Sequence, residues 1–184
     1  MNNYGCGATA RSGRLSVVPD RREPDEQNLD LSSLDLGHLA LFVGYGYADA
    51  VKRELEREGF EGLTFSHGFV FQHLLERERT IGELSARLGV TQQAASKVIA
   101  ELLRLGYVER ERDPKDARIH KVRLSERGRR SVQTSRRARA RLERRLAKLA
   151  GESAFDAARA LLAKLLEELG GAAAVRGRRV RAPR

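Results

Sequence analysis

Residues 80–105, "TIGELSARLGVTQQAASKVIAELLRL", predict two short helices joined by a tight turn. Thr80 and Glu83 have the spacing of a capping box, in which each side chain accepts a hydrogen bond from the other residue's backbone N–H. Gly89 is placed to end the first helix, and Thr91 to cap the second. Two helices joined by a glycine-containing turn of three or four residues form a helix-turn-helix unit.

The second of these helices has two different ends. Its C-terminal half is apolar and has to be packed, whereas its start places polar side chains among small alanines: Thr91, Gln92, Gln93, Ser96 and Lys97. Gln pairs with adenine, and Lys binds guanine or phosphate. In helix-turn-helix proteins the first residues of the second helix reach the base edges. We therefore predict that these five residues contact DNA, although an ordinary solvated helix face has the same composition.

A predicted hairpin follows directly. Residues 107–112 and 119–124 have the pattern of strands, and "DPKDAR" between them is rich in turn formers. A basic hairpin after a helix-turn-helix is a wing, and Arg118 is predicted to enter the DNA minor groove, whose negative potential favours arginine. Asp116 is predicted to hold the Arg118 guanidinium by an ion pair, and Lys115 and Lys121 are further predicted DNA contacts. The alternative is an exposed turn with an incidental ion pair.

Residues 80–128 resemble the winged helix-turn-helix of the MarR family of bacterial transcriptional regulators, and the resemblance extends over about 65–149. The most specific part is the family's D-x-R, alternating aliphatics and Ser/Thr-x-x-Gly, which stand here as Asp116, Arg118, Val122, Leu124, Ser125 and Gly128. Val122 occupies a position where Leu is more usual. The resemblance implies a homodimer that binds a pseudopalindromic operator, commonly as a repressor released by a small ligand or an oxidant.

The whole chain is predicted to be mostly helical, with the hairpin as its small β element, because Leu and Ala dominate and Trp is absent. Residues 1–30 are predicted to be a disordered arm and 31–63 an N-terminal dimerisation helix. The winged helix-turn-helix is assigned to 64–124, C-terminal dimerisation helices to 125–170, and a basic disordered tail to 171–184. The resemblance implies that the first and last helices interleave with those of a second subunit.

Individual helix starts are also predicted. Ser32 is expected to cap a helix over about 33–58, with Asp35 at its third position. A helix from Thr64 is expected to turn five apolar residues inward, namely Phe65, Phe69, Val70, Leu74 and Leu75. Ser125 is expected to cap a long helix to about Leu149.

A last helix is expected to begin at Ser153 with Asp156. Its wide apolar stripe needs a partner and comprises Phe155, Ala158, Leu161, Leu162, Leu165, Leu166 and Leu169. Periodicity alone does not separate a dimer interface from an intramolecular core.

The charge favours an anionic partner. The 35 Lys and Arg against 25 Asp and Glu give +10, which suits nucleic acid, although it also serves solubility. Ten of the basic residues lie in 125–150, where a solvated face is the simpler interpretation and Arg127, Arg129 and Arg130 are placed for phosphate contact. The five arginines of 171–184 are expected to add nonspecific DNA affinity. No apolar run approaches a membrane span, no signal peptide is recognised, and a bacterial cytoplasmic protein associated with the nucleoid is expected.

Catalytic and metal-binding patterns are missing from the sequence, so an enzyme, a bound metal and a cofactor are not predicted. Family regulators often bind phenolic or other small anionic ligands, so His38, Tyr45, His67 and His73 are candidate ligand-binding residues, with structural roles as the alternative. Cys6 is a candidate oxidation sensor, although nothing around it lowers the pKa of its thiol. The main alternative to a ligand-responsive regulator is a nonspecific architectural DNA-binding protein.

Overall fold

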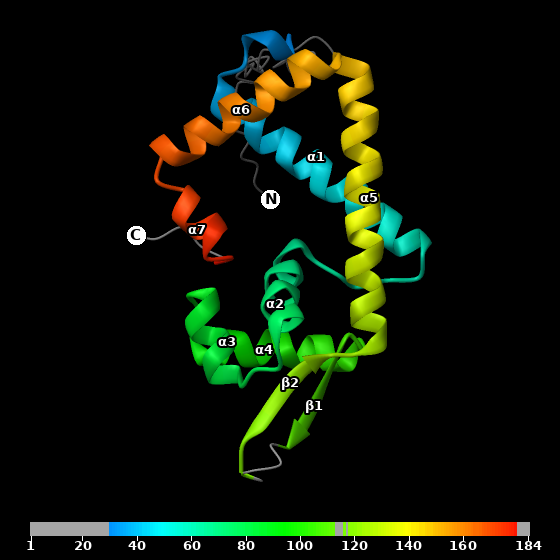
Figure 1. The fold of residues 1–184 in the computed structure, drawn as a ribbon, viewed down its shortest axis with the longest axis vertical. Helices are drawn as coiled ribbons and strands as arrows, with labels where there is room; N and C mark the ends of the chain where they lie inside the picture. Colours follow the sequence, from blue (N-terminus) through cyan, green and yellow to red (C-terminus); the bar gives the residue numbers. More distant parts are fainter. Residues whose placement is uncertain (1–29, 113–115, 117, 180–184) are drawn as a thin grey trace, which may run out of the picture. The chain divides into compact units, whose positions relative to one another are not determined.

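The structure, a computed structural model, describes residues 30–112, 116 and 118–179 (Figure 1). The chain divides into two units, residues 1–39 and 40–184. The described part of the first unit contains the 3-10 helix η1 (Leu31–Ser33) and the start of α1 (Leu36–Arg57). Residues 1–29, with Cys6 and nearly all of the predicted arm, lie outside the described residues.

The predicted start of the first helix was wrong. The Ser32 hydroxyl donates to Asp30 at 2.8 Å and the Ser32 backbone N–H donates to the same carboxylate at 2.9 Å, so Ser32 lies inside η1, which Asp30 caps, and does not cap α1. Asp35 takes the capping position, because its Oδ1 accepts from the backbone N–H of His38 at 3.0 Å. The Ser32 hydroxyl binds the nearby Asp30 carboxylate instead of a backbone N–H of α1.

The helix-turn-helix forms as predicted. Helix α2 (Phe65–Glu76) is followed by α3 (Ile81–Leu88) and α4 (Gln92–Arg104). The capping box at the start of α3 is present, with Glu83 N donating to Thr80 Oγ1 at 3.1 Å and Thr80 N to Glu83 Oε2 at 2.7 Å. Gly89 adopts a left-handed φ of 69°, which turns the chain out of α3.

The buried face of α2 differs from the prediction. Phe65 is 70 % exposed and Leu75 is 38 % exposed, whereas His67 and His73 are buried beside Val70. Phe65 is the first residue of α2, and its ring meets that of Phe69 edge-on at 5.4 Å. The helix therefore packs a face that includes two histidines, and each of them makes one hydrogen bond within the fold, His67 to Thr64 and His73 to Arg178.

The hairpin consists of β1 (Val108–Arg112) and β2 (His120–Leu124), paired antiparallel with Val108 opposite Leu124. In Figure 1 it projects from the helices α2, α3 and α4. Arg79, in the connection between α2 and α3, adds a single bridge to β2, with Arg79 N to Val122 O at 3.0 Å and Val122 N to Arg79 O at 2.7 Å. This bridge fastens the base of the hairpin to the end of α2.

Three helices follow the hairpin, namely α5 (Glu126–Ala150), α6 (Glu152–Glu168) and α7 (Ala172–Arg176). Ser125 caps α5 as predicted, accepting from Gly128 N at 3.0 Å. Helix α6 begins one residue after Gly151, so Ser153 lies inside the helix and does not cap it. The segment predicted as a disordered tail contains α7, so that prediction was wrong for residues 172–176.

One hydrophobic core joins these elements within residues 40–184. It combines Val51 and Leu55 of α1 with buried side chains of α2, α3, α4, the hairpin and α5. Tyr107, at the junction of α4 and β1, is fully buried and donates its hydroxyl to Glu61 O at 2.8 Å. In the part of the chain that the structure describes, no helix is both long and apolar enough to cross a membrane.

Candidate nucleic-acid interface

The start of α4 is a rigid platform for polar side chains. Thr91 caps the helix by accepting from the backbone N–H of Ala94 at 3.2 Å. On the inner side, Ala95, Ile99 and Leu102 are at most 1 % exposed. Because α4 is anchored by these buried residues, the direction of its outer side chains is set by the core.

The five residues predicted to contact DNA lie together on the outer side of α4. Thr91, Gln92, Gln93, Ser96 and Lys97 are all exposed. The spacing of residues 92, 93, 96 and 97 places them on one helix face. Within the described residues the side chains of these four make no hydrogen bond or ion pair, so their donors and acceptors face solvent.

The hairpin tip presents Arg118 to solvent. Asp116 Oδ1 accepts a hydrogen bond from the backbone N–H of Arg118 at 2.9 Å, and the two side chains form no ion pair. The predicted ion pair was therefore wrong, because a short Asp side chain reaches the N–H two residues later more easily than a guanidinium. Asp116 shapes the turn, and the Arg118 guanidinium makes no hydrogen bond or ion pair with other described residues. Lys115 lies outside the described residues.

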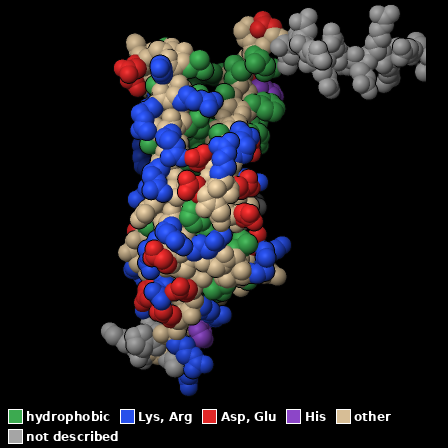
Figure 2. Space-filling model, turned by 90° about the vertical axis from the view of Figure 1, so that its right-hand side faces the viewer, with side chains coloured by type: hydrophobic (Ala, Val, Ile, Leu, Met, Phe, Trp, Pro, Cys, Tyr) green, Lys and Arg blue, Asp and Glu red, His purple; other side chains and the backbone are tan. Residues whose placement is uncertain are grey.

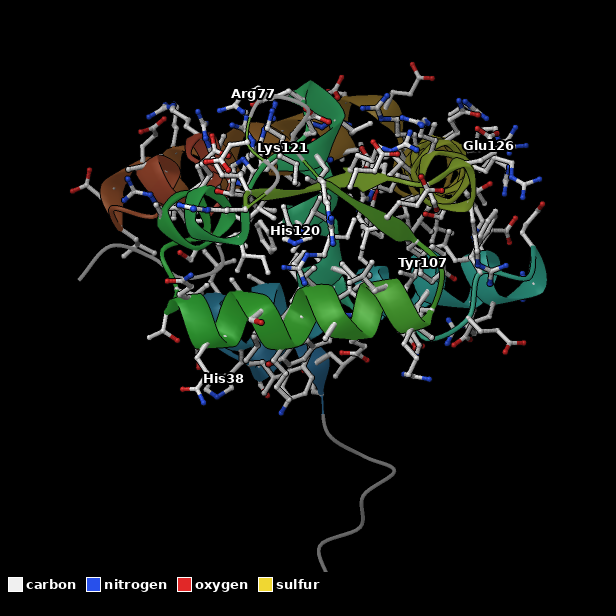
Figure 3. The ribbon with its side chains drawn as sticks, turned by 90° about the horizontal axis from the view of Figure 1, so that it is seen from below. His38, Arg77, Tyr107, His120, Lys121 and Glu126 are labelled. Carbon is white, nitrogen blue, oxygen red and sulfur yellow. The ribbon has the colours of Figure 1, made fainter. Side chains whose placement is uncertain are left out.

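Lys121 has a structural partner that the sequence did not predict. Its Nζ lies 3.0 Å from Glu78 Oε1, and the Lys121 side chain is 27 % exposed. Figure 3 shows Lys121 on the hairpin, toward the connection between α2 and α3 that carries Arg77. Together with the Arg79 bridge, this ion pair holds the hairpin against α2.

Two arginines of β1 were missed by the sequence analysis. Arg110 and Arg112 are exposed and make no ion pair with any described residue. Glu109 and Glu111 lie on the opposite face of the strand, where both bind Arg123, at 2.7 and 2.5 Å. The alternation of "ERER" was a usable signal, because successive strand residues point to opposite faces.

Arg127, predicted to be placed for phosphate contact, has a structural role. Its guanidinium carbon lies 4.9 Å from the Tyr107 ring centroid and 5.7 Å from that of Phe60. Its Nη2 also donates to Gly59 O at 2.8 Å. Arg129 and Arg130 are exposed on α5. Figure 2, which views the molecule from the side of α5, shows Lys and Arg side chains interspersed with Asp and Glu over this face.

His67 stabilises the start of α2. Its Nδ1 accepts from the backbone N–H of Thr64 at 3.2 Å, and its Nε2 lies 3.6 Å from Glu101 Oε2 on α4. Burial lowers the pKa of His67, although Glu101 acts in the opposite direction. The side chain is 2 % exposed and connects two helices of the core.

The other three ligand-binding candidates have different local surroundings. His73 is buried on α2, and its Nε2 donates to Arg178 O at 3.2 Å. Tyr45 is 62 % exposed on α1, with its ring edge-on to Phe42. His38, in the first unit, is exposed and its Nδ1 contacts Asp35 Oδ2 at 2.5 Å.

A cavity of about 670 Å³ lies among α1, α2, α5 and α6. Tyr47, Leu55, Phe71 and Val132 form part of its apolar wall, and its lining also includes cationic side chains, Lys52, Arg136 and Arg139. Tyr45, His67 and His73 are not among its lining residues. The sequence analysis did not single out Tyr47, which lines the cavity.

No group of three or more His, Cys, Asp or Glu residues that could hold a metal ion occurs in 30–112, 116 and 118–179.

Residues 61–119 match the model of the MarR family. The match covers the connection after α1, the helix-turn-helix and β1, and it ends one residue before β2, so it confirms the resemblance over that segment. No curated protein gives a significant match to the chain.

Several solved structures share the fold. YusO from Bacillus subtilis is 21% identical, with a TM-score of 0.57, and the match covers 72% of this chain and 91% of that one. MarR from E. coli in its reduced form is 24% identical, with a TM-score of 0.57, covering 72% and 97%. A mutant of Staphylococcus aureus MepR bound to an oligodeoxyribonucleotide is 19% identical, with a TM-score of 0.54, covering 74% and 99%. The chain therefore has the winged-helix fold of these regulators.

Proposed function

We propose, from the MarR family match of residues 61–119, that this protein is a sequence-specific DNA-binding transcriptional regulator. In this proposal it is a homodimer that represses from a pseudopalindromic operator and is released by a small ligand. One observation carries the proposal. The exposed face of α4 carries Gln92, Gln93, Ser96 and Lys97, whose side chains make no hydrogen bond with other described residues. The opposite face of the same helix is buried in the core.

These side chains suit the reading of base edges. Gln binds adenine through two hydrogen bonds in the major groove, and Lys binds guanine or phosphate. The hairpin supports the same assignment, because Arg118 at its tip is exposed and suits a narrow minor groove. Arg110 and Arg112 add positive charge on β1 for the phosphate backbone.

Exposed apolar side chains support a homodimer. Large hydrophobic residues of α1, of α6 and of the C-cap of α6 lie at the surface, namely Leu41, Phe42, Val43, Tyr45, Leu161, Leu162, Leu166 and Leu169. An apolar surface of this kind indicates an interface. We assign it to a second copy of the chain, as the family resemblance implies.

The cavity among α1, α2, α5 and α6 is the proposed effector site. Its apolar wall, with Tyr47 and Phe71, accommodates an aromatic or aliphatic body, and Arg136 and Arg139 attract an anionic group. This arrangement replaces the predicted set of His38, Tyr45, His67 and His73 as the proposed ligand-binding residues.

The test is a selection of bound duplexes from a random DNA library, followed by titration of the selected duplex and a scrambled duplex at two salt concentrations. We expect a palindromic consensus and discrimination of about 10³-fold or more. No enriched motif, with affinity that only collapses as salt rises, would instead establish the nonspecific architectural alternative.

Arg118→Ala is expected to weaken binding of the selected operator about ten-fold, because one groove contact is lost. The loss should be larger with A·T-rich than with G·C-rich flanks, since the minor groove of A-tracts is narrow and more negative. Fluorescence titration on both duplexes measures it. Arg144→Ala, which removes the same charge from an exposed position of α5, is the control and should change affinity less than two-fold. Equal effects of the two substitutions would remove Arg118 from the interface.

A further inference from the structure

The C-terminal segment of the described chain docks back onto the winged helix. Residues 171–179, here called the C-terminal strap, contain α7, and both Ala172 and Ala174 are buried. The strap leaves α6 through Gly170, which has a left-handed φ of 74°. Its arginine content had suggested a solvated tail, but two small apolar residues allow it to pack.

Arg178 makes the specific contacts of the strap. Its Nη1 donates to Gln72 O at 3.2 Å and to Glu76 Oε1 at 2.6 Å, and its carbonyl oxygen accepts from His73 Nε2 at 3.2 Å. Three residues on the last turns of α2 therefore bind one residue more than 100 positions later. Arg178 also has a φ of 51°, a conformation that residues other than glycine rarely adopt. Such a conformation persists where surrounding contacts impose it.

The strap contacts continue to the hairpin. Glu76, which binds Arg178 through Oε1, binds Arg79 Nη2 through Oε2 at 2.5 Å. Arg79 is 1 % exposed, and its backbone pairs with Val122 of β2. On the other side, Arg179 Cδ lies 3.9 Å from the Cβ position of Gly89, in the turn before α4. The strap therefore contacts residues next to both predicted DNA-contacting elements, the hairpin and the start of α4.

The strap also closes a loop in the fold. The winged helix is joined to α6 through the chain itself, by way of α5, and the strap returns from α6 to α2. If α5 were its only connection to α6, the winged helix could turn about α5. The strap adds a second connection, which restricts this rotation. In a dimeric regulator such turning would change the separation of the two recognition helices, and that separation has to match the spacing of the half-sites.

We propose that the C-terminal strap holds the winged helix in one orientation and that Arg178 is a positioning residue for half-site spacing. This inference rests on the proposed function as a dimeric operator-binding protein. Its physical basis is preorganisation: a winged helix that is already oriented loses less conformational freedom on binding DNA. Random DNA, which is bound through phosphates, does not demand one spacing.

The experiment compares Arg178→Ala with Arg176→Ala in the full-length protein. Arg176 lies in the same strap, but its side chain bonds only Glu167 among the described residues, so it is a matched control. Affinities are measured for the selected operator, for operators with one base pair inserted or deleted between half-sites, and for random DNA. For Arg178→Ala we expect an operator affinity lower by roughly five- to ten-fold and a smaller penalty for altered spacing. Arg176→Ala should keep the wild-type pattern.

Release of the strap has its own readout at His73. The Nε2 of His73 donates to the Arg178 carbonyl, while its Nδ1 is buried without a partner. Burial lowers the pKa of His73, Arg79 and Arg87 act in the same direction, and the Arg178 carbonyl and Glu76 oppose them. When the strap leaves, the ring loses both its burial and the Arg178 carbonyl; burial has the larger effect, so the His73 pKa measured by NMR titration should rise toward its ordinary value. Ala174→Asp, which places a charge at a buried strap position, is a second variant that should release the strap.

Three results separate the outcomes. A raised His73 pKa together with relaxed spacing in Arg178→Ala and Ala174→Asp supports the proposal. A raised His73 pKa with unchanged operator affinity and spacing preference, or an unchanged pKa in both variants, would overturn it. Failure of the wild-type protein to prefer an operator over random DNA would contradict the proposed function itself, and with it the role of the strap in spacing.

Discussion

Gly128→Ala is expected to lower the free energy of unfolding by about 3 kcal/mol or more, because the first turn of α5 leaves no room for a methyl group. A Cβ atom at Gly128 would lie 2.1 Å from the carbonyl oxygen of Tyr107 and 3.1 Å from Leu124 Cδ2. The carbonyl group is held in place, since it accepts a hydrogen bond from Ser125 N at 3.1 Å and Tyr107 is fully buried. The substitution therefore has to separate α5 from the end of α4.

Urea denaturation followed by circular dichroism measures this effect. The control is Gly46→Ala, at a position inside α1 where no atom lies within 4 Å of an added Cβ. Because Ala is favoured over Gly in a helix interior, this control should be stabilising, by up to about 1 kcal/mol. A Gly128→Ala protein as stable as the wild type would show that α5 does not approach Tyr107 so closely.

Gln93→Ala is expected to reduce the preference for the operator over random DNA by roughly ten-fold or more, because a bidentate contact to a base is worth about 1–3 kcal/mol. Gln93 is exposed on the outer face of α4, and its side chain makes no bond to other described residues. The substitution therefore removes a contact to DNA without disturbing the core. Binding to random DNA should change less than two-fold, since phosphate contacts supply it.

Titration of both duplexes at one salt concentration tests this expectation. Gln133→Ala, at an exposed position of α5, makes the same chemical change away from α4 and should leave both affinities unchanged. A repeated library selection with Gln93→Ala should return a consensus that has lost one base preference in each half-site. An equal loss of affinity on operator and random DNA would assign Gln93 to the phosphate backbone instead.

Local signals in the sequence predicted the helix-turn-helix well. The Thr80–Glu83 capping box, the left-handed Gly89 and the Thr91 cap each join residues that are at most four positions apart, and all three are present. The hairpin was predicted with strands that differ from the observed ones by a residue each. The buried residues of α4 could be predicted from the helical spacing of its apolar residues, because only one face of the helix is apolar.

The sequence was a weaker guide where a residue had several available partners. Ser32 was within reach of Asp30 as well as of the next helix, and the carboxylate won. Asp116 bonded a backbone N–H instead of the Arg118 guanidinium. Lys121 was predicted to contact DNA because it is basic and lies in the hairpin. Its Nζ instead lies 3.0 Å from Oε1 of Glu78, which is 43 positions earlier in the chain. In these cases the sequence shows which polar groups are available for bonding, but not which partner each of them binds.

The winged helix-turn-helix, its caps and turns, and the polar outer face of α4 could be predicted from the sequence, because they depend on periodicity and on hydrogen bonds between near neighbours. The burial of His67 and His73, the close approach of Gly128 to Tyr107, and the return of Arg178 to α2 could not be predicted in this way. These features depend on contacts between residues that are far apart in the chain. Burial of a polar group costs free energy unless a partner offsets it, and the partner of His73 Nε2 is the Arg178 carbonyl, 105 positions later in the chain.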